Sequence, residues 1–381
     1  MTSKSDRTWH LLSNRVLRGL LFVACLIHGM SFAAKVASAQ PQDPVLAAAK
    51  AAKRLERPIL FQDQAGYTLF SPREGKSQVA FRANSPITSA SLSNDGNRLA
   101  LGSYDGGQRR IWVRDLADDP QPLTSDHAPN YLQEVGFSPD DWFVAYQITG
   151  HTVGEDVLYL LDLQAKRHWQ ITPEGMASKY FSWSPDGKHL ALGLVFDQKT
   201  EVFGDMLMVE QEMDVVILDV ATRQFRRVTH TGHAIHELAW SPDGKWIAFK
   251  SPEGLSIVST AVAAERDKSG EDAKPRLLIQ NISKEGPPRW SPDSQSLAVS
   301  RHASKEIGSN DQLIVVPLDG EPTSYEIAAQ IWYYDFSPAG DAIALSASDR
   351  NLSLLNLKTK ERSVLVNDVG FWSPVAWASR R

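Results

Sequence analysis

One phrase recurs six times between residues 90 and 340, and it constrains the fold of this chain more than any other feature. Each copy has an apolar or aromatic residue, a serine, a Pro-Asp-Gly turn or a variant of it, and then a short apolar run. The serines of successive copies lie 45, 46, 57, 50 and 46 residues apart, at Ser93, Ser138, Ser184, Ser241, Ser291 and Ser337. This period is the length of a four-stranded propeller blade and exceeds that of most helical solenoid repeats.

The turn in this phrase predicts a hairpin. In the third copy, Pro185 sets the first corner, while Asp186 and Gly187 supply the side-chain hydrogen bond and the positive φ that a tight reversal needs. Apolar runs of strand length follow the turns, as at residues 246–249 and 343–345. Further runs, such as 157–161 and the edge-like 169–172, complete each repeat, so we expect antiparallel meanders of four strands.

The two ends of the chain predict how the repeats close. A final run that ends at Trp377 reads as an innermost strand without partners after it, and three strand-like runs at 58–61, 67–70 and 78–81 precede the first complete repeat. Together they make a composite blade, which removes two exposed sheet edges. We therefore expect one all-β domain, a seven-bladed β-propeller over residues 58–381. A six-bladed ring is the alternative, because residues 71–75 look like a degenerate copy of the phrase.

The phrase resembles the blade motif of the TolB-like, WD40-like (PD40) propeller family. The fullest copy runs from Trp240 to Phe249, and Gly232 with His233 looks like the Gly-His dipeptide of WD repeats. The resemblance covers roughly residues 85 to 350 and implies a fold rather than a chemistry, because these motifs are structural in the family. TolB itself carries an α/β domain before its propeller, and the segment before residue 58 is too short for one, so TolB's role is not simply transferred.

The first 39 residues read as a signal peptide. Basic residues precede a compact apolar core from Leu20 to Ile27, and small residues at Ala37 and Ala39 fit a cleavage site before Gln40. The apolar core is too short to span a bilayer, so we expect a soluble periplasmic or secreted protein. The alternative is a lipoprotein modified at Cys25. Residues 40–57 are expected to be a linker with one short helix.

Charge narrows the range of partners. Without residues 1–39, which hold five basic and one acidic residue, the chain has 35 basic and 44 acidic residues. A net negative surface without a basic stripe argues against nucleic acid as a partner. A closed ring hides its sheet edges without a second copy, so we expect a monomer whose partner is an envelope or periplasmic protein or peptide.

Three histidines form the best candidate for chemistry. His230, His233 and His236 lie at the entrance to an inner strand, and imidazole is the commonest ligand of zinc, copper or nickel. The resemblance to oligogalacturonate lyase, a propeller that holds a metal with histidines near its channel, implies a metal-dependent lyase or hydrolase acting on oligosaccharides. A structural role for His233 is the other interpretation, so the expected cofactor is none, with a divalent metal as the alternative.

A second candidate is the rim of the central channel. Side chains four residues before each motif aromatic are expected to line the channel mouth: Thr88, Gln133, Lys179, His236, Gly286, Trp332 and Ser373. Tyr131, Tyr180 and Tyr333 lie beside them, and aromatic side chains with polar tips suit the anchoring of peptides or sugars. Packing between blades is the alternative role for Trp332 and the tyrosines.

A third candidate is the insert from Asp197 to Asp214, which carries several acidic residues and two methionines. Long excursions from a rigid scaffold often carry function, although an extended hairpin with a solvated face is the simpler interpretation. No nucleophile elbow, phosphate-binding glycine loop or His-Glu-x-x-His segment occurs, so no catalytic residue is assigned. The sequence therefore favours a non-enzymatic binding or scaffolding propeller, with the metal-dependent lyase or hydrolase as the alternative.

Overall fold

The structure is a computed structural model of the whole chain, and all its described residues belong to the unit Pro41–Arg381. It describes residues 57–377 except 64–65, 83–86, 106–107, 117–120, 123–130, 150–155, 173–175, 204–205, 262–273, 284–285, 303–309 and 371–373. The signal peptide and the short helix expected before residue 57 lie outside this range. Within it the chain forms strands only, and no helix is long and apolar enough to cross a membrane.

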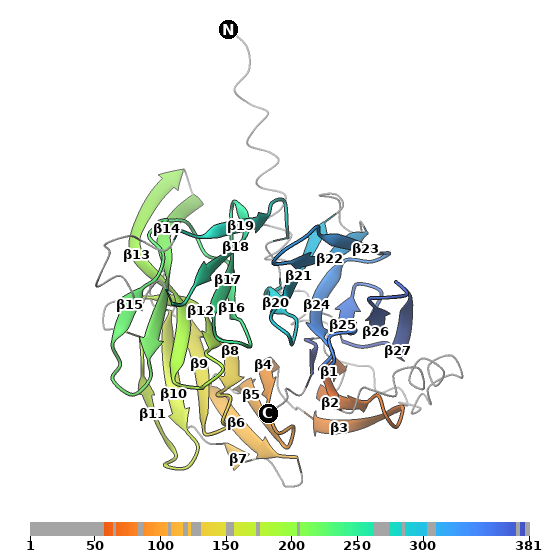
Figure 1. The fold of residues 1–381 in the computed structure, drawn as a ribbon. Coiled ribbons are helices and arrows are strands. Elements are labelled where there is room, and N and C mark those ends of the chain that lie inside the picture. The colour runs from red at the N-terminus through yellow and green to blue at the C-terminus, as the bar shows by residue number, and fades with distance from the viewer. Residues whose placement is uncertain are drawn as a thin grey trace. The chain divides into compact units, whose positions relative to one another are not determined.

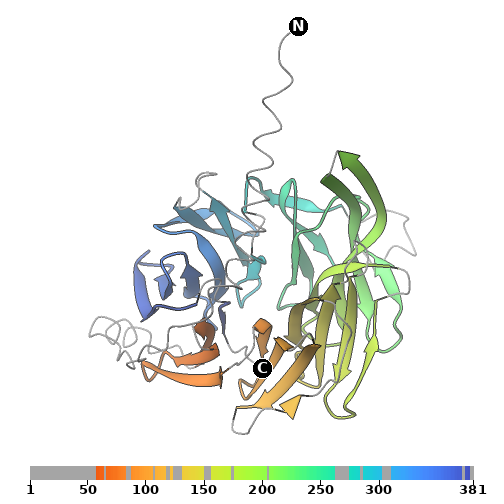
Figure 2. The same ribbon diagram turned by 180° about the vertical axis from the view of Figure 1, so that it is seen from behind.

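The strands form seven sheets of four antiparallel strands, arranged as blades around an axis (Figures 1 and 2). Blade 1 contains β28 (Ala376–Trp377), β1 (Ile59–Asp63), β2 (Gly66–Ser71) and β3 (Lys76–Arg82). Blade 2 contains β4 (Ile87–Leu92), β5 (Arg98–Asp105), β6 (Gln108–Asp115) and β7 (Gln121–Pro122). Blade 3 contains β8 (Tyr131–Phe137), β9 (Phe143–Thr149), β10 (Val157–Asp162) and β11 (Arg167–Gln170).

The remaining four blades follow in chain order, each with its innermost strand first. Blade 4 contains β12 (Ser178–Trp183), β13 (His189–Phe203), β14 (Met206–Asp219) and β15 (Phe225–Arg227). Blade 5 contains β16 (Glu237–Trp240), β17 (Trp246–Ser251), β18 (Gly254–Ser259) and β19 (Arg276–Ile279). Blade 6 contains β20 (Arg289–Trp290), β21 (Ser296–His302), β22 (Asp311–Pro317) and β23 (Thr323–Ile327). Blade 7 contains β24 (Ile331–Phe336), β25 (Ala342–Ala347), β26 (Asn351–Asn356) and β27 (Arg362–Asn367).

The first blade joins the two ends of the described chain. Ile59 of β1 pairs with Trp377 of β28, and Leu60 pairs with Ala376. The backbone N–H of Trp377 also donates a 2.9 Å hydrogen bond to Asp335 Oδ2 in blade 7, which ties the composite blade to its neighbour. The expected composite blade is therefore confirmed, and the ring has seven blades rather than six.

The core lies between the blades. Each of the seven clusters of buried apolar residues takes its members from two consecutive blades. One of these clusters joins blade 7 to blade 1. Leu190, Leu192 and Leu194 of β13 are fully buried in this way. Burial of each such side chain contributes about 1.5–3 kcal/mol. The strands of consecutive blades thus stabilise one another face to face.

The repeated phrase forms six equivalent turns, which we call the turn belt (residues 93–96, 138–141, 184–187, 241–244, 291–294 and 337–340). In the first five turns the serine hydroxyl donates a 2.6 Å hydrogen bond to the aspartate two residues later. Burial of Asp243 opposes its ionisation, but hydrogen bonds from Ser241 and from Lys245 outweigh burial and lower its pKa. The pKa values of Asp95, Asp186 and Asp293 are lowered as well, so these four aspartates stay ionised and hold their turns closed.

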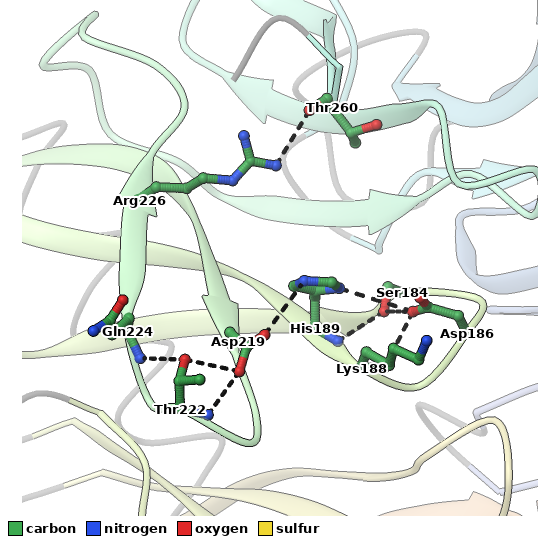
Figure 3. A network of polar contacts seen from close by, with 9 residues as sticks. All are labelled: Ser184, Asp186, Lys188, His189, Asp219, Thr222, Gln224, Arg226 and Thr260. Atoms are coloured by element: carbon green, nitrogen blue, oxygen red, sulfur yellow. Dashed lines mark hydrogen bonds and ion pairs between the residues drawn. The ribbon is translucent and has the colours of Figure 1, made fainter. Parts of the chain in front are cut away.

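Figure 3 shows the turn of blade 4 with its surroundings. Asp186 accepts the hydrogen bond from Ser184, and the His189 ring lies between two carboxylates, 3.9 Å from Asp186 Oδ1 and 3.7 Å from Asp219 Oδ2. Arg226 on β15 reaches across to a backbone carbonyl of blade 5. The turn is thus one part of a polar network that links adjacent blades.

Neighbouring turns of the belt are joined where glycine is replaced. The fourth position of every turn has positive φ, and it is glycine in four turns but Asp141 in blade 3 and Ser294 in blade 6. The buried Asp141 carboxylate accepts hydrogen bonds from the backbone of Asn94 at 2.8 Å and of Asp95 at 3.1 Å in the preceding turn. Ser294 Oγ accepts one from Asp243 N at 3.0 Å. Asp141 and Ser294, whose backbones are in the left-handed region, therefore each bind the preceding turn through their side chains. We call these two links the clasps of the belt.

Candidate functional site: the axial cluster

Ionisable side chains from five innermost strands meet near the axis of the ring. We call this group the axial cluster, and its members are Glu134 (β8), Tyr180 (β12), Glu237 (β16), Arg289 (β20) and Asp335 (β24). Glu134 of blade 3 interacts electrostatically with Glu237 two blades away and with Arg289 three blades away. Groups from blades that are not adjacent can approach one another only across the axis.

The two glutamates have pKa values far above the usual range. Burial and then the nearby charge of Glu237 raise the pKa of Glu134 to about 8, although Arg289 and the Phe181 N–H oppose the change. Burial raises the pKa of Glu237 to about 7 against the opposing effects of Lys250 and Arg289. Repulsion between the two carboxyls when both are ionised thus adds to the effect of burial on the pKa of Glu134.

Arg289 is the central cation of the cluster. Burial raises the pKa of Asp335, and Arg289 is the largest of the groups that oppose this shift. Arg289 therefore faces three carboxyl groups, from Glu134, Glu237 and Asp335. Its Nε is buried and makes no hydrogen bond to the residues that the structure describes. Buried donors in native proteins are almost always paired, so this arginine has unused capacity for a hydrogen-bonding group.

Tyr180 is held in a strained conformation beside the glutamates. It has φ of 57°, in the left-handed region, and it is the extra residue of a bulge in β12 between Lys179 and Phe181. Its backbone N–H donates a 3.2 Å hydrogen bond to Gln147 Oε1. Burial, followed by the charges of Glu237 and Glu134, raises its pKa. Strained non-glycine residues of this kind are typical of functional sites.

A fully buried lysine connects the axial cluster to a loop. Lys250 on β17 pairs in register with Glu237, and its side chain is 1% exposed. Its Nζ donates hydrogen bonds to the backbone carbonyls of Ser283, at 3.1 Å, and of Gly286. The ammonium group thus fixes the segment that leads into β20 and Arg289.

Ser283, His302 and Asp311 have the connectivity of a catalytic triad. Ser283 Oγ lies 2.8 Å from His302 Nε2, and His302 Nδ1 lies 2.9 Å from Asp311 Oδ1. However, Ser283 is 3% exposed, and Asp311 Oδ2 also accepts a 2.8 Å hydrogen bond from Ile331 N. Asp214 of blade 4 holds the segment leading to its next blade in the same way, through Thr231 N at 2.8 Å. The parallel favours a structural clamp that ties successive blades.

The predicted rim residues divide into three groups. Tyr180 belongs to the axial cluster, while Lys179 and His236 are half-buried neighbours of cluster members. Trp332 is buried at 5% exposure, and Tyr333 packs against the core between blades 7 and 1. The side chains of Tyr131 and Gln133, as well as those of Thr88 and Ser373, lie outside the described residues.

The three candidate metal ligands are not brought together as a set. His230 and His233 are exposed, and His233 Nε2 lies 3.3 Å from Glu253 Oε1, whereas His236 is half-buried beside Glu237. In the described part of the chain, no group of three or more histidine, cysteine, aspartate or glutamate residues is placed to hold a metal ion. The residues present therefore do not fit the metal centre that the sequence suggested.

Sequence reasoning missed four of the five cluster members. Glu134 and Glu237 occupy the third position before the motif aromatic, and Arg289 and Asp335 occupy the position immediately before it. The predicted rim residues occupy the fourth position instead. Aligning the six repeats and looking for ionisable residues at every inner-strand position would have revealed all four.

Comparisons with known proteins agree with this architecture. Residues 225–251 match the WD domain, G-beta repeat family. An uncharacterized protein of Agrobacterium fabrum is 28% identical over 186 residues, which is 48% of this chain and 57% of that protein, so the match spans little more than half of the relative's length. TolB from Acinetobacter baumannii has 18% identity and a TM-score of 0.50, over 87% of this chain and 86% of that chain.

A second solved structure widens the comparison. Oligogalacturonate lyase in complex with manganese has 14% identity and a TM-score of 0.56, over 80% of this chain and 82% of that chain. At these identities the likenesses show a common fold and no common activity. The seven four-stranded blades establish that the chain is a seven-bladed β-propeller, similar in fold to TolB and to oligogalacturonate lyase.

Proposed function

We propose that this propeller is a non-enzymatic module of the bacterial periplasm that binds a protein or peptide at its axis. Three observations support the proposal: a leader-like N-terminal segment, a fold shared with TolB, and a set of ionisable groups that converge from five blades. The predicted rim residues, among them Gln133, Lys179, His236 and Trp332, would surround the bound segment.

The axial cluster is the observation that carries the proposal. Its carboxyl groups outnumber the cations that face them, which are Arg289 and, at Glu237, Lys250. Burying ionisable groups with shifted pKa values lowers the stability of the folded state, and such groups concentrate at functional sites. A lysine or arginine side chain from a partner would complete the charge balance of Glu134 and Glu237 and would favour their ionised forms.

The test compares axial variants with a matched surface control. The mature protein carrying Glu134→Gln and Glu237→Gln should lose a partner that the wild type captures from its own envelope extract. A double variant at two exposed acids, Glu321→Gln with Glu361→Gln, should retain it. Equal capture by both double variants would place the binding surface away from the axis.

Export has its own test. We expect the protein in the soluble periplasmic fraction, with a mature N-terminus at Gln40. If Cys25 were a lipid attachment site, the protein would instead sediment with membranes and a Cys25→Ser substitution would release it. Protein that stays in the cytoplasm with Met1 intact would contradict export altogether.

A lyase acting on an oligosaccharide is the second candidate. The favouring observation is that the pKa of Glu237, about 7, lies in the range of general acid–base catalysts, next to Arg289 and Tyr180. The likeness to oligogalacturonate lyase suggests the substrate to try. Ultraviolet absorbance of an unsaturated product, measured with and without added Mn²⁺ and after His236→Ala, checks this candidate. Absence of product under all conditions would leave the binding module.

A further inference from the structure

A two-stranded ribbon extends from blade 4 beyond the rest of its sheet. We call it the acidic ribbon; it consists of residues 197–203 of β13 and 206–212 of β14, which pair with each other from Asp197↔Glu212 to Phe203↔Met206. β12 follows β13 only as far as Leu194 and β15 pairs with β14 only at 216–218. Both ribbon edges are therefore without a neighbouring strand among the described residues, and both views show the ribbon projecting from its blade (Figures 1 and 2).

Two successive pairs of the acidic ribbon consist of apolar residues. Phe203 pairs with Met206, and Val202 pairs with Leu207. An isolated two-stranded ribbon is only marginally stable in water, and open edges invite pairing with another strand. Among the described residues, the open edges of the acidic ribbon thus remain available to a further strand.

The base of the acidic ribbon is well anchored. Gln211 Nε2 donates a 3.2 Å hydrogen bond to Gln198 Oε1, and the Arg227 guanidinium lies 3.9 Å from the centre of the Phe196 ring. Arg227 also pairs with the fully buried Asp214. These contacts hold the first part of the ribbon in one position, which lowers the entropy lost when a partner binds.

Charge identifies the class of partner. The hairpin from 197 to 212 carries five acidic residues and one basic residue, Lys199, whose Nζ is already paired with Glu212 Oε1 at 3.1 Å. Like charge disfavours a second copy of this hairpin and an anionic lipid surface. A cationic strand is the complementary occupant.

We propose that the acidic ribbon is a docking strand for an extended segment of a partner protein in which lysine or arginine alternates with apolar residues. The segment adds to a free edge through backbone hydrogen bonds, and its basic side chains face the ribbon carboxylates. This surface is separate from the axial cluster, so the propeller has two binding surfaces rather than one.

The test uses the mature protein and a labelled octapeptide of alternating lysine and valine, blocked at both ends. We expect saturable binding by fluorescence anisotropy, weakened about tenfold when NaCl is raised from about 50 to about 300 mM. Hydrogen exchange should slow within residues 197–212 when the peptide is bound.

Two variants and one control locate the binding. Replacing residues 200–209 by Asn-Gly joins the paired residues Lys199 and Glu210 with a two-residue hairpin turn, and should weaken binding by more than about tenfold. Glu201→Gln with Glu210→Gln should weaken it about threefold to fivefold through lost charge. The exposed control, Glu321→Gln with Glu361→Gln, should leave it unchanged.

Several outcomes would overturn the proposal. Equal binding by the shortened variant, equal binding of an alternating glutamate–valine peptide, or unchanged hydrogen exchange within residues 197–212 would each do so. Anionic vesicles that protect the ribbon as the peptide does would assign it to a lipid surface instead. If the shortened variant fails to melt cooperatively, the charge variant alone decides. A negative result for the ribbon does not bear on the proposed binding of a partner at the axis, because that proposal is tested separately by Glu134→Gln with Glu237→Gln.

Discussion

The turn belt and the axial cluster are built from the same repeats, but the belt uses the same residues in most blades and the axial cluster uses different ones. In the belt, the same serine-to-aspartate hydrogen bond recurs at 2.6 Å in five blades. Along the inner strands, the third position before the motif aromatic holds four residue types in six blades: Ser89, Glu134, Tyr180, Glu237, Pro287 and Tyr333. The comparison shows that the residues repeated in each blade stabilise the ring, whereas the positions that vary between blades mark the candidate functional site.

The largest expected effect tests the belt. Asp141→Ala should lower the free energy of unfolding by about 3 kcal/mol, because it leaves backbone N–H groups of Asn94 and Asp95 unpaired and puts alanine at φ 61°. Denaturant unfolding measures this loss. Asp141→Asn keeps one acceptor oxygen and should lose less; equal losses would show that the retained acceptor oxygen does not stabilise the turn.

Arg289→Met tests the axis. Without this cation, the pKa values of Glu134, Glu237 and Asp335 should rise further, because Arg289 opposes all three shifts. We expect a loss of about 2 kcal/mol in the free energy of unfolding at pH 8. At pH 5 the glutamates are protonated, so the loss should be much smaller. A loss that does not depend on pH would indicate that Arg289 acts only through packing.

Glu134→Gln should stabilise the protein in a pH-dependent way. Because the folded-state pKa of about 8 lies above the ordinary value of 4.5, ionisation of Glu134 destabilises the fold. The wild type should therefore lose stability relative to the variant as pH rises from about 5 to about 8, reaching about 1 kcal/mol after allowance for solvent screening. Thermal melts across this range check the trend, and a difference that grows toward low pH would contradict it.

The smallest expected effect compares the contributions of the Asp141 and Ser294 clasps to stability. Ser294→Gly removes one hydrogen bond to Asp243 N but also relieves the left-handed backbone at φ 62°. The two effects oppose each other, so we expect a change of less than about 1 kcal/mol in the free energy of unfolding. A loss as large as that of Asp141→Ala would mean that both clasps are equally important.

Much of the fold was predictable because it repeats. Blade length, the order of strands and the composite blade followed from the spacing of the phrase and from the unpartnered run at Trp377. Each of these rests on local turn chemistry and on the need to hide sheet edges, and both can be read from sequence.

The site was less predictable because bulges change the side-chain alternation of the inner strands. The pairing of β8 with β9 shifts between Leu132 and Glu134, and that of β12 with β13 shifts between Lys179 and Phe181. One extra residue turns the following side chains to the other face, and nothing in the sequence marks where it occurs. Ionisable groups about fifty residues apart also give no local motif, so their meeting is visible only in three dimensions.

Pairing between Ile59 and Trp377 also governs how the molecule is assembled. Until Trp377 is made, the hairpin that holds Ile59 presents an uncovered edge, and closing the circle requires a contact between residues that are very far apart in the chain. Closure of the ring thus waits on the synthesis of residues 376 and 377. Aggregation during that interval, rather than the stability of the finished ring, should limit the yield of soluble protein.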